Sequence, residues 1–417
     1  MTIDELAHPA FEGLTKMFLL CSFSCGMLSG MMRNHPIAAP HSNPAPPEPV
    51  PPDAGSLEAS PTVPTGLRRG RGAVSNRTSR FERYSYRAFD DGWGRDDEEV
   101  QSIRTRVLAD TSRSIIARNK SPDIGFDQSV NPYRGCEHGC FYCYARPSHA
   151  WLGLSPGLDF ESTLFAKHDA ARLLRAELQK KSYKPSVIAL SGNTDPYQPV
   201  EKELRITRSV LEVLLEARHP VAIITKSQMI LRDIDLLSEM ARLGLVHAAV
   251  SITTLDRKLA RKMEPRAATP SRRLDVVRML SEAGIPTSVM VAPVIPALND
   301  HEIESILEAA AGAGAMRASY VLVRLPLEIA EMAVEWLEEN APGRAKHVMN
   351  LIRGSRGGEN YDSRFFERQR GNGPYAELIG KRFALAQRRF GLNRDLPPLV
   401  TGHFRKPQCE RGQLSLF

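Results

Sequence analysis

The sequence predicts an α/β fold, a partial (β/α)6 barrel of the TIM type with extensions at both ends. From about residue 126, short apolar runs alternate with stretches of helical periodicity. This alternation is typical of parallel strands joined by crossover helices. A length of 417 residues allows one barrel with extensions or two or three domains. A doubly wound open sheet is the alternative architecture, because periodicity alone does not distinguish an open sheet from a barrel.

Six apolar runs are the expected strands, and helices are expected between them. The runs are Phe126–Asn131, Val187–Ser191, Val221–Lys226, Ala248–Ile252, Thr287–Ala292 and Ser319–Leu325. Between the second and third runs, one apolar stripe recurs at helical spacing and predicts a buried helix face: Ile206, Val210, Val213, Leu214 and Ala217. Further helices are expected to begin near Arg232, at Ser271 and at Asn299, where Asn299 and Asp300 are good N-cap residue types.

The two ends of the chain differ from this core. Ten of the 30 prolines fall between Pro36 and Pro64, so residues 1–66 are predicted to be a disordered linker or to include sequence upstream of a true start at Met31 or Met32. The apolar stretch 17–32 is short for a membrane span and lacks a cationic head. The other expected units are a basic arm at 67–120, a core at 121–330, a helical extension at 331–408 and a tail at 409–417.

The net charge of +7 is unevenly placed. Residues 67–87 contain seven arginines and one glutamate, and residues 344–411 contain 15 basic and six acidic residues. Such clusters are either solvated surface or a footprint for the phosphates of a nucleic acid. Under the second interpretation, we expect substitution of Arg68, Arg69 and Arg71 by alanine to weaken DNA binding. Four aromatic residues interleave with the first cluster and either stack on bases or hold the arm on the core: Phe81, Tyr84, Tyr86 and Phe89.

Polar residues stand at the ends of successive expected strands, where parallel sheets place their reactive groups. The second strand is followed by 191–199 (SGNTDPYQP) and the third by Thr225-Lys226-Ser227. The fourth ends at Ser251, and the sixth carries Arg324. Turns and caps explain many such residues individually, but their shared position predicts one site.

The strongest signal is the run 131–147, NPYRGCEHGCFYCYARP, in which Cys136, Cys140 and Cys143 have the spacing C-x3-C-x2-C. Three thiolates on one short loop converge on one metal centre, and soft thiolates suit zinc or an iron–sulfur cluster. Zinc requires a fourth ligand, for which His138, His149 and Cys409 are candidates. Cys21 and Cys25 have no expected role.

This triplet resembles the signature of the radical SAM superfamily, C-x3-C-x-Φ-C, in which an aromatic residue, here Tyr142, precedes the last cysteine. The resemblance covers about residues 120–330. It implies a [4Fe–4S] cluster on Cys136, Cys140 and Cys143 whose fourth iron binds S-adenosylmethionine. One electron then cleaves the cosubstrate to a 5′-deoxyadenosyl radical, which abstracts a hydrogen atom. It also implies an electron donor such as flavodoxin or ferredoxin.

The resemblance further implies which strand ends contact the cosubstrate. The segment 191–195 stands where the superfamily receives the methionine amino group, so Ser191, Asn193, Thr194 and Asp195 are candidates, although the usual Gly-Gly-Glu is absent. Three segments look like those of the spore photoproduct lyase branch: TDPYQP, the TKS after the third strand and the strand end at Ser251. There, a lysine and a serine at these positions contact the cosubstrate carboxylate or ribose, which implies those roles for Lys226 and Ser251.

One departure from that branch concerns hydrogen return. The lyase uses a barrel cysteine for this step, whereas this chain has only Cys21, Cys25 and Cys409 beyond the triplet. The same route of thymine-dimer reversal is therefore not expected. The GRGAVSN arm and the rest of the chain resemble an uncharacterised bacterial family related to this branch.

The last five residues, Gln413-Leu-Ser-Leu-Phe417, resemble the peptide motif that binds the bacterial sliding clamp. In that interpretation Gln413 enters a polar pocket, and Leu414, Leu416 and Phe417 provide the apolar contacts. A terminal segment docked on its own barrel is the alternative.

We therefore expect a cytoplasmic bacterial radical SAM enzyme that acts on DNA in repair or modification. Two alternatives stay open: a radical SAM enzyme for RNA, protein or a small metabolite, and a zinc-stabilised nucleic-acid adaptor without catalysis.

Overall fold

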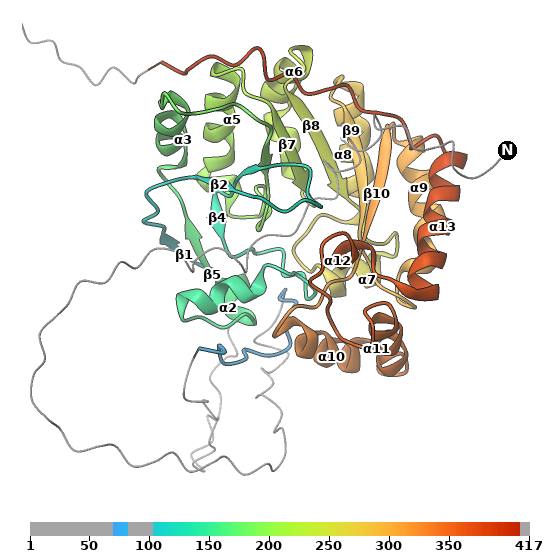
Figure 1. Cartoon of the computed structure of the whole chain (residues 1–417). Coiled ribbons are helices and arrows are strands. Elements are labelled where there is room, and N and C mark those ends of the chain that lie inside the picture. The colour runs from blue at the N-terminus through green and yellow to red at the C-terminus, as the bar shows by residue number, and fades with distance from the viewer. Residues whose placement is uncertain (1–69, 82–102, 409–417) are drawn as a thin grey trace, which may run out of the picture.

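A parallel sheet organises the computed structural model, which describes residues 70–81 and 103–408 (Figure 1). The sheet has seven strands in the order β10-β9-β8-β7-β6-β3-β2. Six of them pair in parallel and each overlaps an expected run: β3 (Gln128–Val130), β6 (Ile188–Leu190), β7 (Val221–Thr225), β8 (Val246–Ser251), β9 (Thr287–Val294) and β10 (Arg317–Leu322). Because these six follow one another in chain order, the order reversal of a doubly wound sheet does not occur. The partial (β/α)6 barrel is confirmed.

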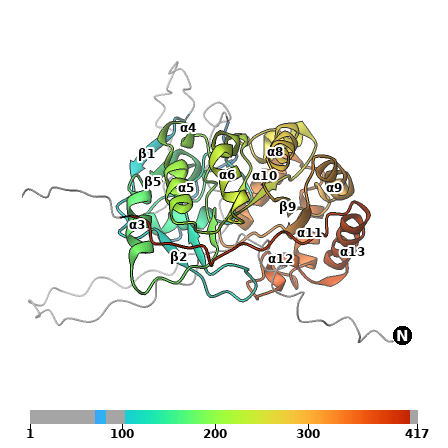
Figure 2. The ribbon, with the colours of Figure 1, turned by 90° about the horizontal axis from the view of Figure 1, so that it is seen from above.

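Helices between the strands cover the outside of the sheet and form an arc when seen from above (Figure 2). They are α3 (Ala170–Gln179), α5 (Ile206–Glu216), α6 (Ile234–Arg242), α8 (Pro270–Glu282) and α9 (Ile303–Gly312). The stripe predicted for α5 is confirmed, since all five of its residues are buried in the main core. Valine, isoleucine and alanine dominate the strands because both faces are covered.

The expected helix starts need adjustment at two places. A 3-10 helix, η4 (Gln228–Asp233), precedes α6, and a second one, η5 (Asp300–Glu302), precedes α9. Asn299 makes no side-chain capping bond. Its amide instead donates to the carbonyls of Thr253 and Pro293 and accepts from the Ile295 N–H. Asn299 is the N-cap residue of η5, as predicted, but its side chain forms a buried cross-link between two strand ends instead of a capping bond.

A second, smaller sheet was not predicted. Its order is β1-β5-β4, with β1 (Arg106–Ala109), β4 (Tyr133–Arg134) and β5 (Thr163–Ala166). Strand β2 (Ile116–Arg118) pairs antiparallel with β3 at the edge of the main sheet. The chain between β4 and β5 holds the 3-10 helix η3 (Arg146–Leu152) and α2 (Leu158–Ser162). These short segments surround the cysteine run with well-packed structure.

The C-terminal extension consists of α10 (Ile329–Asn340), α11 (Ala345–Gly354), α12 (Glu367–Arg370) and α13 (Gly373–Arg389). Figure 1 shows α10 and α11 together at one end of the molecule, apart from the helices of the arc. Asp123 lies ahead of β3, and its carboxylate accepts from Arg368 of α12 at 2.5 Å and from the Phe366 N–H. Since α12 contacts β10, this ion pair links the two edges of the open sheet.

Several expectations fall outside the described residues: the proline-rich linker, Cys21, Cys25, Tyr84, Tyr86, Phe89, Cys409 and the terminal pentapeptide. Within the ranges that are described, none of the helices combines the length and the apolar character needed to cross a membrane.

Trp336 of α10 is the largest fully buried side chain and stacks on Phe141 of the cysteine run, with ring centroids 3.9 Å apart. We expect Trp336→Ala to lower the free energy of unfolding by about 3–5 kcal/mol, since it leaves a large cavity. Denaturant titration measures this. The matched control is Leu385→Ala, at a side chain 60% exposed on α13, which should change stability by about 0.5 kcal/mol or less. Equal effects would contradict packing of the extension on the cysteine run.

Candidate functional site

One pocket opens at the carboxyl ends of the parallel strands. It encloses about 850 Å³, open space at its mouth included. The structure brings every site residue predicted from the sequence to its wall: Cys136, Cys140, Tyr142, Cys143, Ser191, Asn193, Thr194, Asp195, Lys226 and Ser251.

The cysteines lie on an irregular loop between β4 and η3, which we call the cluster loop (residues 135–146). Gly135 and Gly139 have φ values of 78° and 68°, a conformation that favours glycine. A Cβ atom on Gly139 would lie 2.8 Å from Oε2 of Glu161. The loop contains two turn bonds, from the Cys143 N–H to the Cys140 carbonyl and from the Arg146 N–H to the Cys143 carbonyl, both 3.2 Å.

Burial raises the pKa of all three thiols, and the pKa of Cys140 reaches about 12. The Asp195 charge adds to the effect on Cys136, and the Glu264 charge adds to that on Cys140. The Lys226 ammonium acts in the opposite direction on Cys140 and Cys143. Thiolates in this environment need a cationic centre beside them, which a metal cluster supplies.

Tyr142 joins the cluster loop to a buried network beneath it. Its hydroxyl donates to Glu264, which also accepts from Thr253 at 2.9 Å and pairs with the buried guanidinium of Arg273. Arg273 in turn donates to the carbonyl of Ser251 at 3.0 Å. Burial alone would raise the pKa of Glu264, but the charges of Arg273 and Lys226 and the hydrogen bonds outweigh it and lower that pKa. The carboxylate therefore stays ionised.

The TDPYQP segment braces the cluster loop from the other side. Gln198 donates to the Gly135 carbonyl at 3.2 Å and accepts from the Glu137 N–H at 2.9 Å, so its amide spans Cys136. The Tyr133 hydroxyl donates to the buried carboxylate of Glu201, at the start of α4 (Glu201–Leu204). These contacts fix strand β4, which leads into the cluster loop, and the backbone around Cys136.

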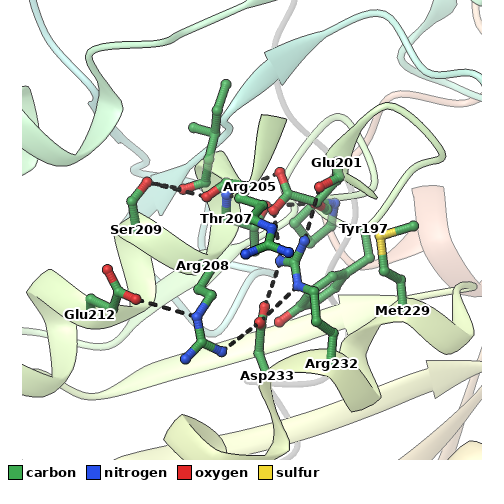
Figure 3. Close-up of polar contacts among 12 residues, drawn as sticks. Tyr197, Glu201, Arg205, Thr207, Arg208, Ser209, Glu212, Met229, Arg232 and Asp233 are labelled. Atoms are coloured by element: carbon green, nitrogen blue, oxygen red, sulfur yellow. Dashed lines mark hydrogen bonds and ion pairs between the residues drawn. The ribbon is translucent and has the colours of Figure 1, made fainter. Parts of the chain in front are cut away.

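Figure 3 shows the polar contacts around Glu201. Arg232 donates to its carboxylate at 2.8 Å and also pairs with Asp233. The Thr207 N–H contacts both carboxylate oxygens at 3.1 Å. The start of α5 and the 3-10 helix η4 are thereby tied to the strand that precedes the cluster loop.

Asp195 lines the pocket, but its carboxylate is occupied by protein donors. Oδ1 accepts from the Thr225 hydroxyl at 2.7 Å and the Tyr197 N–H at 2.9 Å, and Oδ2 accepts from the Lys226 N–H at 2.7 Å. His138 of the cluster loop lies 3.4 Å from Oδ2. This carboxylate joins the ends of β6 and β7 to the cluster loop, and a contact between Asp195 and the methionine amino group stays a prediction.

The other predicted residues face the pocket in different ways. Thr194 is buried and donates to the Tyr133 carbonyl at 3.2 Å, whereas Ser191 has a φ of 102° that turns the chain after β6. The ammonium nitrogen of Lys226 lies 5.9 Å from the ring centre of Tyr142. Ser251 is the last residue of β8. Lys226 and Ser251 thus stand at neighbouring strand ends on the cysteine side of the pocket.

The pocket lining also includes apolar strand residues and one guanidinium. The apolar residues include Ile224, Met290 and Val321. Arg324, just beyond β10, lies over the rings of Tyr144 and Tyr361 at 5.2 and 5.4 Å and donates to the Tyr361 hydroxyl at 2.8 Å. Sequence reasoning noted Arg324 but missed Tyr144, Glu264 and Arg273. Only Tyr144 had a local signal, its place directly after Cys143.

The basic arm does not present all its arginines to solvent. Arg71 donates to the carbonyls of Glu161 and Ile103, and burial lowers its pKa. Arg77 pairs with Glu335, and Arg80 pairs with Glu328. Arg71 therefore anchors the arm, and its contact with DNA phosphates stays a prediction. Arg68, Arg69, Arg83 and Arg87 lie outside the described residues.

The sequence profile of the radical SAM superfamily matches residues 130–310, which span the cluster loop and the strand ends that line the pocket. A protein of Mycobacterium tuberculosis is 38% identical over 242 residues, which cover 57% of this chain and 71% of that protein. The chain belongs to the radical SAM superfamily. It is an enzyme of that superfamily, whose members use a [4Fe–4S] cluster and S-adenosylmethionine.

Two further similarities are more distant. The radical SAM Nalpha-GlyT isomerase of Pseudomonas phage M6 is 25% identical over 227 residues, 54% of this chain and 45% of the isomerase. A structure of spore photoproduct lyase complexed with dinucleoside spore photoproduct is 14% identical, with a TM-score of 0.48, over 68% of this chain and 78% of the lyase.

The residues present fit the superfamily's cluster. Three soft donors face one pocket, and burial leaves their thiolates without full solvation. Among the described residues, neither histidine candidate is available as a fourth zinc ligand: His138 is held by Asp195, and Nε2 of His149 donates to the Thr163 carbonyl at 2.9 Å. Among the residues the structure describes, no group of three His, Cys, Asp or Glu side chains is arranged to hold a single metal ion. Membership of the superfamily overturns the adaptor without catalysis.

We expect Glu264→Gln to lower the free energy of unfolding at pH 7 by about 3–5 kcal/mol, because the Arg273 charge remains buried without its anion. The pKa of Glu264 is lowered in the folded protein, so its contribution is present above the ordinary value of about 4.3 and is lost as the pH falls below it. Urea titrations at pH 7 and below pH 4 should show the difference between parent and variant shrinking. Glu203→Gln, at an exposed position, is the control. A pH-independent difference would contradict this account.

Proposed function

We propose that this radical SAM enzyme abstracts a hydrogen atom from DNA in a repair or modification reaction. The observation that carries the proposal is the mixed lining of one pocket. Cysteines, Lys226 and Ser251 line it together with apolar strand residues and a tyrosine-flanked arginine. We assign the first group to the cofactors, and the second group to a substrate with a planar apolar part and an anionic group.

For the cofactors, we assign the cluster to Cys136, Cys140 and Cys143. When bound, the cluster and S-adenosylmethionine supply a 5′-deoxyadenosyl radical. Lys226 and Ser251 would hold the carboxylate or ribose of the cosubstrate, since an ammonium is a natural partner for a carboxylate. We assign its amino group to the segment that contains Ser191, Asn193, Thr194 and Asp195, which line the same pocket.

For the substrate, apolar side chains restrict water and hydrogen donors near the reacting carbon. Ile224, Met290 and Val321 line the pocket and all belong to one packed apolar cluster. Among the described residues the cysteines are Cys136, Cys140 and Cys143, so hydrogen return by a further cysteine would have to come from outside the described ranges.

Three features favour a nucleic acid as substrate. Arg324 is held in an orientation that suits bonding to a phosphate, and Tyr144 and Tyr361 present flat rings beside it. The C-terminal region 344–411 carries a strong excess of basic residues. The terminal pentapeptide, if it binds the sliding clamp, would bring the enzyme to replicating DNA. RNA, a protein or a small metabolite are the competing substrate classes.

We expect Lys226→Gln to raise the KM for S-adenosylmethionine by about ten- to a hundredfold, because a charge-assisted hydrogen bond is lost. The assay is 5′-deoxyadenosine formation by the anaerobically reconstituted protein with dithionite. The iron content per chain should remain that of the parent. Lys202→Gln, at an exposed lysine, is the control. An unchanged KM would remove Lys226 from the cosubstrate site.

We expect deuterium from labelled DNA to enter 5′-deoxyadenosine, and Arg324→Gln to reduce that transfer about tenfold or more. Substrate-free cleavage of S-adenosylmethionine should stay unchanged in the variant, since we assign Arg324 to the substrate and not to the cosubstrate. Arg317→Gln is the matched control, because Arg317 begins the same strand and pairs with Asp395 away from the pocket. Transfer from labelled RNA or protein, with none from DNA, would overturn the proposed substrate.

A further inference from the structure

A strap formed by residues 70–81 lies against the cluster loop from outside the barrel (Figure 1). The strap precedes the superfamily match by more than 40 residues in the chain. Its hydrogen bonds end on two different elements, α2 and α10. It is therefore placed to connect the cluster loop, the inserted segment between β4 and β5, and the C-terminal extension.

The contacts of the strap centre on the Glu161 carboxylate, which is completely buried in α2. The N–H groups of Gly72 and Ala73 donate to Oε2 and Oε1 at 2.9 and 2.8 Å. Arg146, the last residue of the cluster loop, pairs with Oε1 and donates through Nε to the Cys140 carbonyl at 2.9 Å. The Glu161 carboxylate thus connects the strap to Arg146, and the Arg146 guanidinium hydrogen-bonds to the backbone of Cys140.

The strap and the loop also touch directly, backbone to backbone. A Cβ atom on Gly72 would lie 1.6 Å from the carbonyl oxygen of Gly139, a distance no side chain can occupy. Gly139 is the residue immediately before Cys140. Gly72 is therefore required by the close approach of two chains, and any larger residue must displace the strap or the loop.

The remaining part of the strap anchors it. Ala73 and Val74 are buried in the same apolar cluster as Phe141 and Trp336. Ser75 donates to Glu335 at 2.6 Å, and Arg77 pairs with the same carboxylate. These contacts anchor the strap to the apolar cluster and to α10, so that the strap stays in contact with the loop at Gly139.

We infer that Glu161 and the strap residues Gly72 and Ala73 are positioning residues for the cluster: they hold the backbone of Cys140 in the geometry that cluster binding requires. The irregular loop has few bonds of its own. The buried Arg146 side chain donates to the carbonyls of Pro156 and Gly157 at 3.1 and 2.8 Å, and Glu161, itself fixed by two backbone N–H groups, holds the other end of the guanidinium. The Cys140 carbonyl is fixed with it.

The test uses the full-length chain and the variants Gly72→Ala and Glu161→Gln. Gly312→Ala is the matched control, because Gly312 is a glycine of α9 with an ordinary φ and no atom within 4 Å of an added Cβ. Two quantities are measured. One is amide hydrogen exchange of the cluster loop in the protein without its cluster, and the other is the rate of iron release to a chelator from the reconstituted protein.

In both variants we expect exchange in residues 140–146 and iron release to become about tenfold faster or more. Exchange in β7 and β8 should match that of the parent, and Gly312→Ala should change neither quantity. The inference is overturned if loop exchange or iron release stays within about twofold of the parent in both variants. It is also overturned if β7 and β8 accelerate as much as the loop, since Glu161 would then serve general stability. Neither readout involves a substrate, so the result is independent of the proposed action on DNA.

Discussion

Buried carboxylates paired with arginines hold the cluster loop, and the site depends on them. Glu161, Glu201 and Glu264 are all buried, and their partners are Arg146, Arg232 and Arg273. Each carboxylate also accepts hydrogen bonds from the loop, from the strand before it or from the strap. Such pairs are poor sources of net stability, because removing two charges from water is costly. Their directional bonds instead specify one conformation for a loop that has little regular structure.

The three pairs come from different parts of the chain. Arg146 and Glu161 belong to the segment between β4 and β5, Glu201 follows β6, and Glu264 and Arg273 follow β8. The strap and α10 add the outer cover through Trp336, which stacks on Phe141. The cluster loop is therefore a junction of the barrel, the inserted segment and both extensions. The barrel strands alone do not account for its geometry.

Local patterns were sufficient for the strands, the buried face of α5 and the cysteine triplet. These features can be recognised from hydrophobic periodicity or from the close spacing of a few neighbouring residues. The second sheet was missed because β1, β4 and β5 are short and pair over distances of 31 residues or more. The protein partners of Asp195 and Arg71 were also missed. Most of them, such as Thr225 and Lys226 for Asp195 and Glu161 for Arg71, come from other regions of the chain.

The amino-acid sequence by itself determined the order of the strands, the three cysteines and the polar residues at successive strand ends. Parallel strands in chain order bring such residues together, and this follows from the alternation of strands and helices. Only the tertiary structure decided which polar groups line the pocket and which are engaged in hydrogen bonds and ion pairs with neighbouring protein groups. That division arises from burial, because a carboxylate that is removed from water is stable only where protein groups donate hydrogen bonds to it. For Glu161, those donors are backbone N–H groups of the strap.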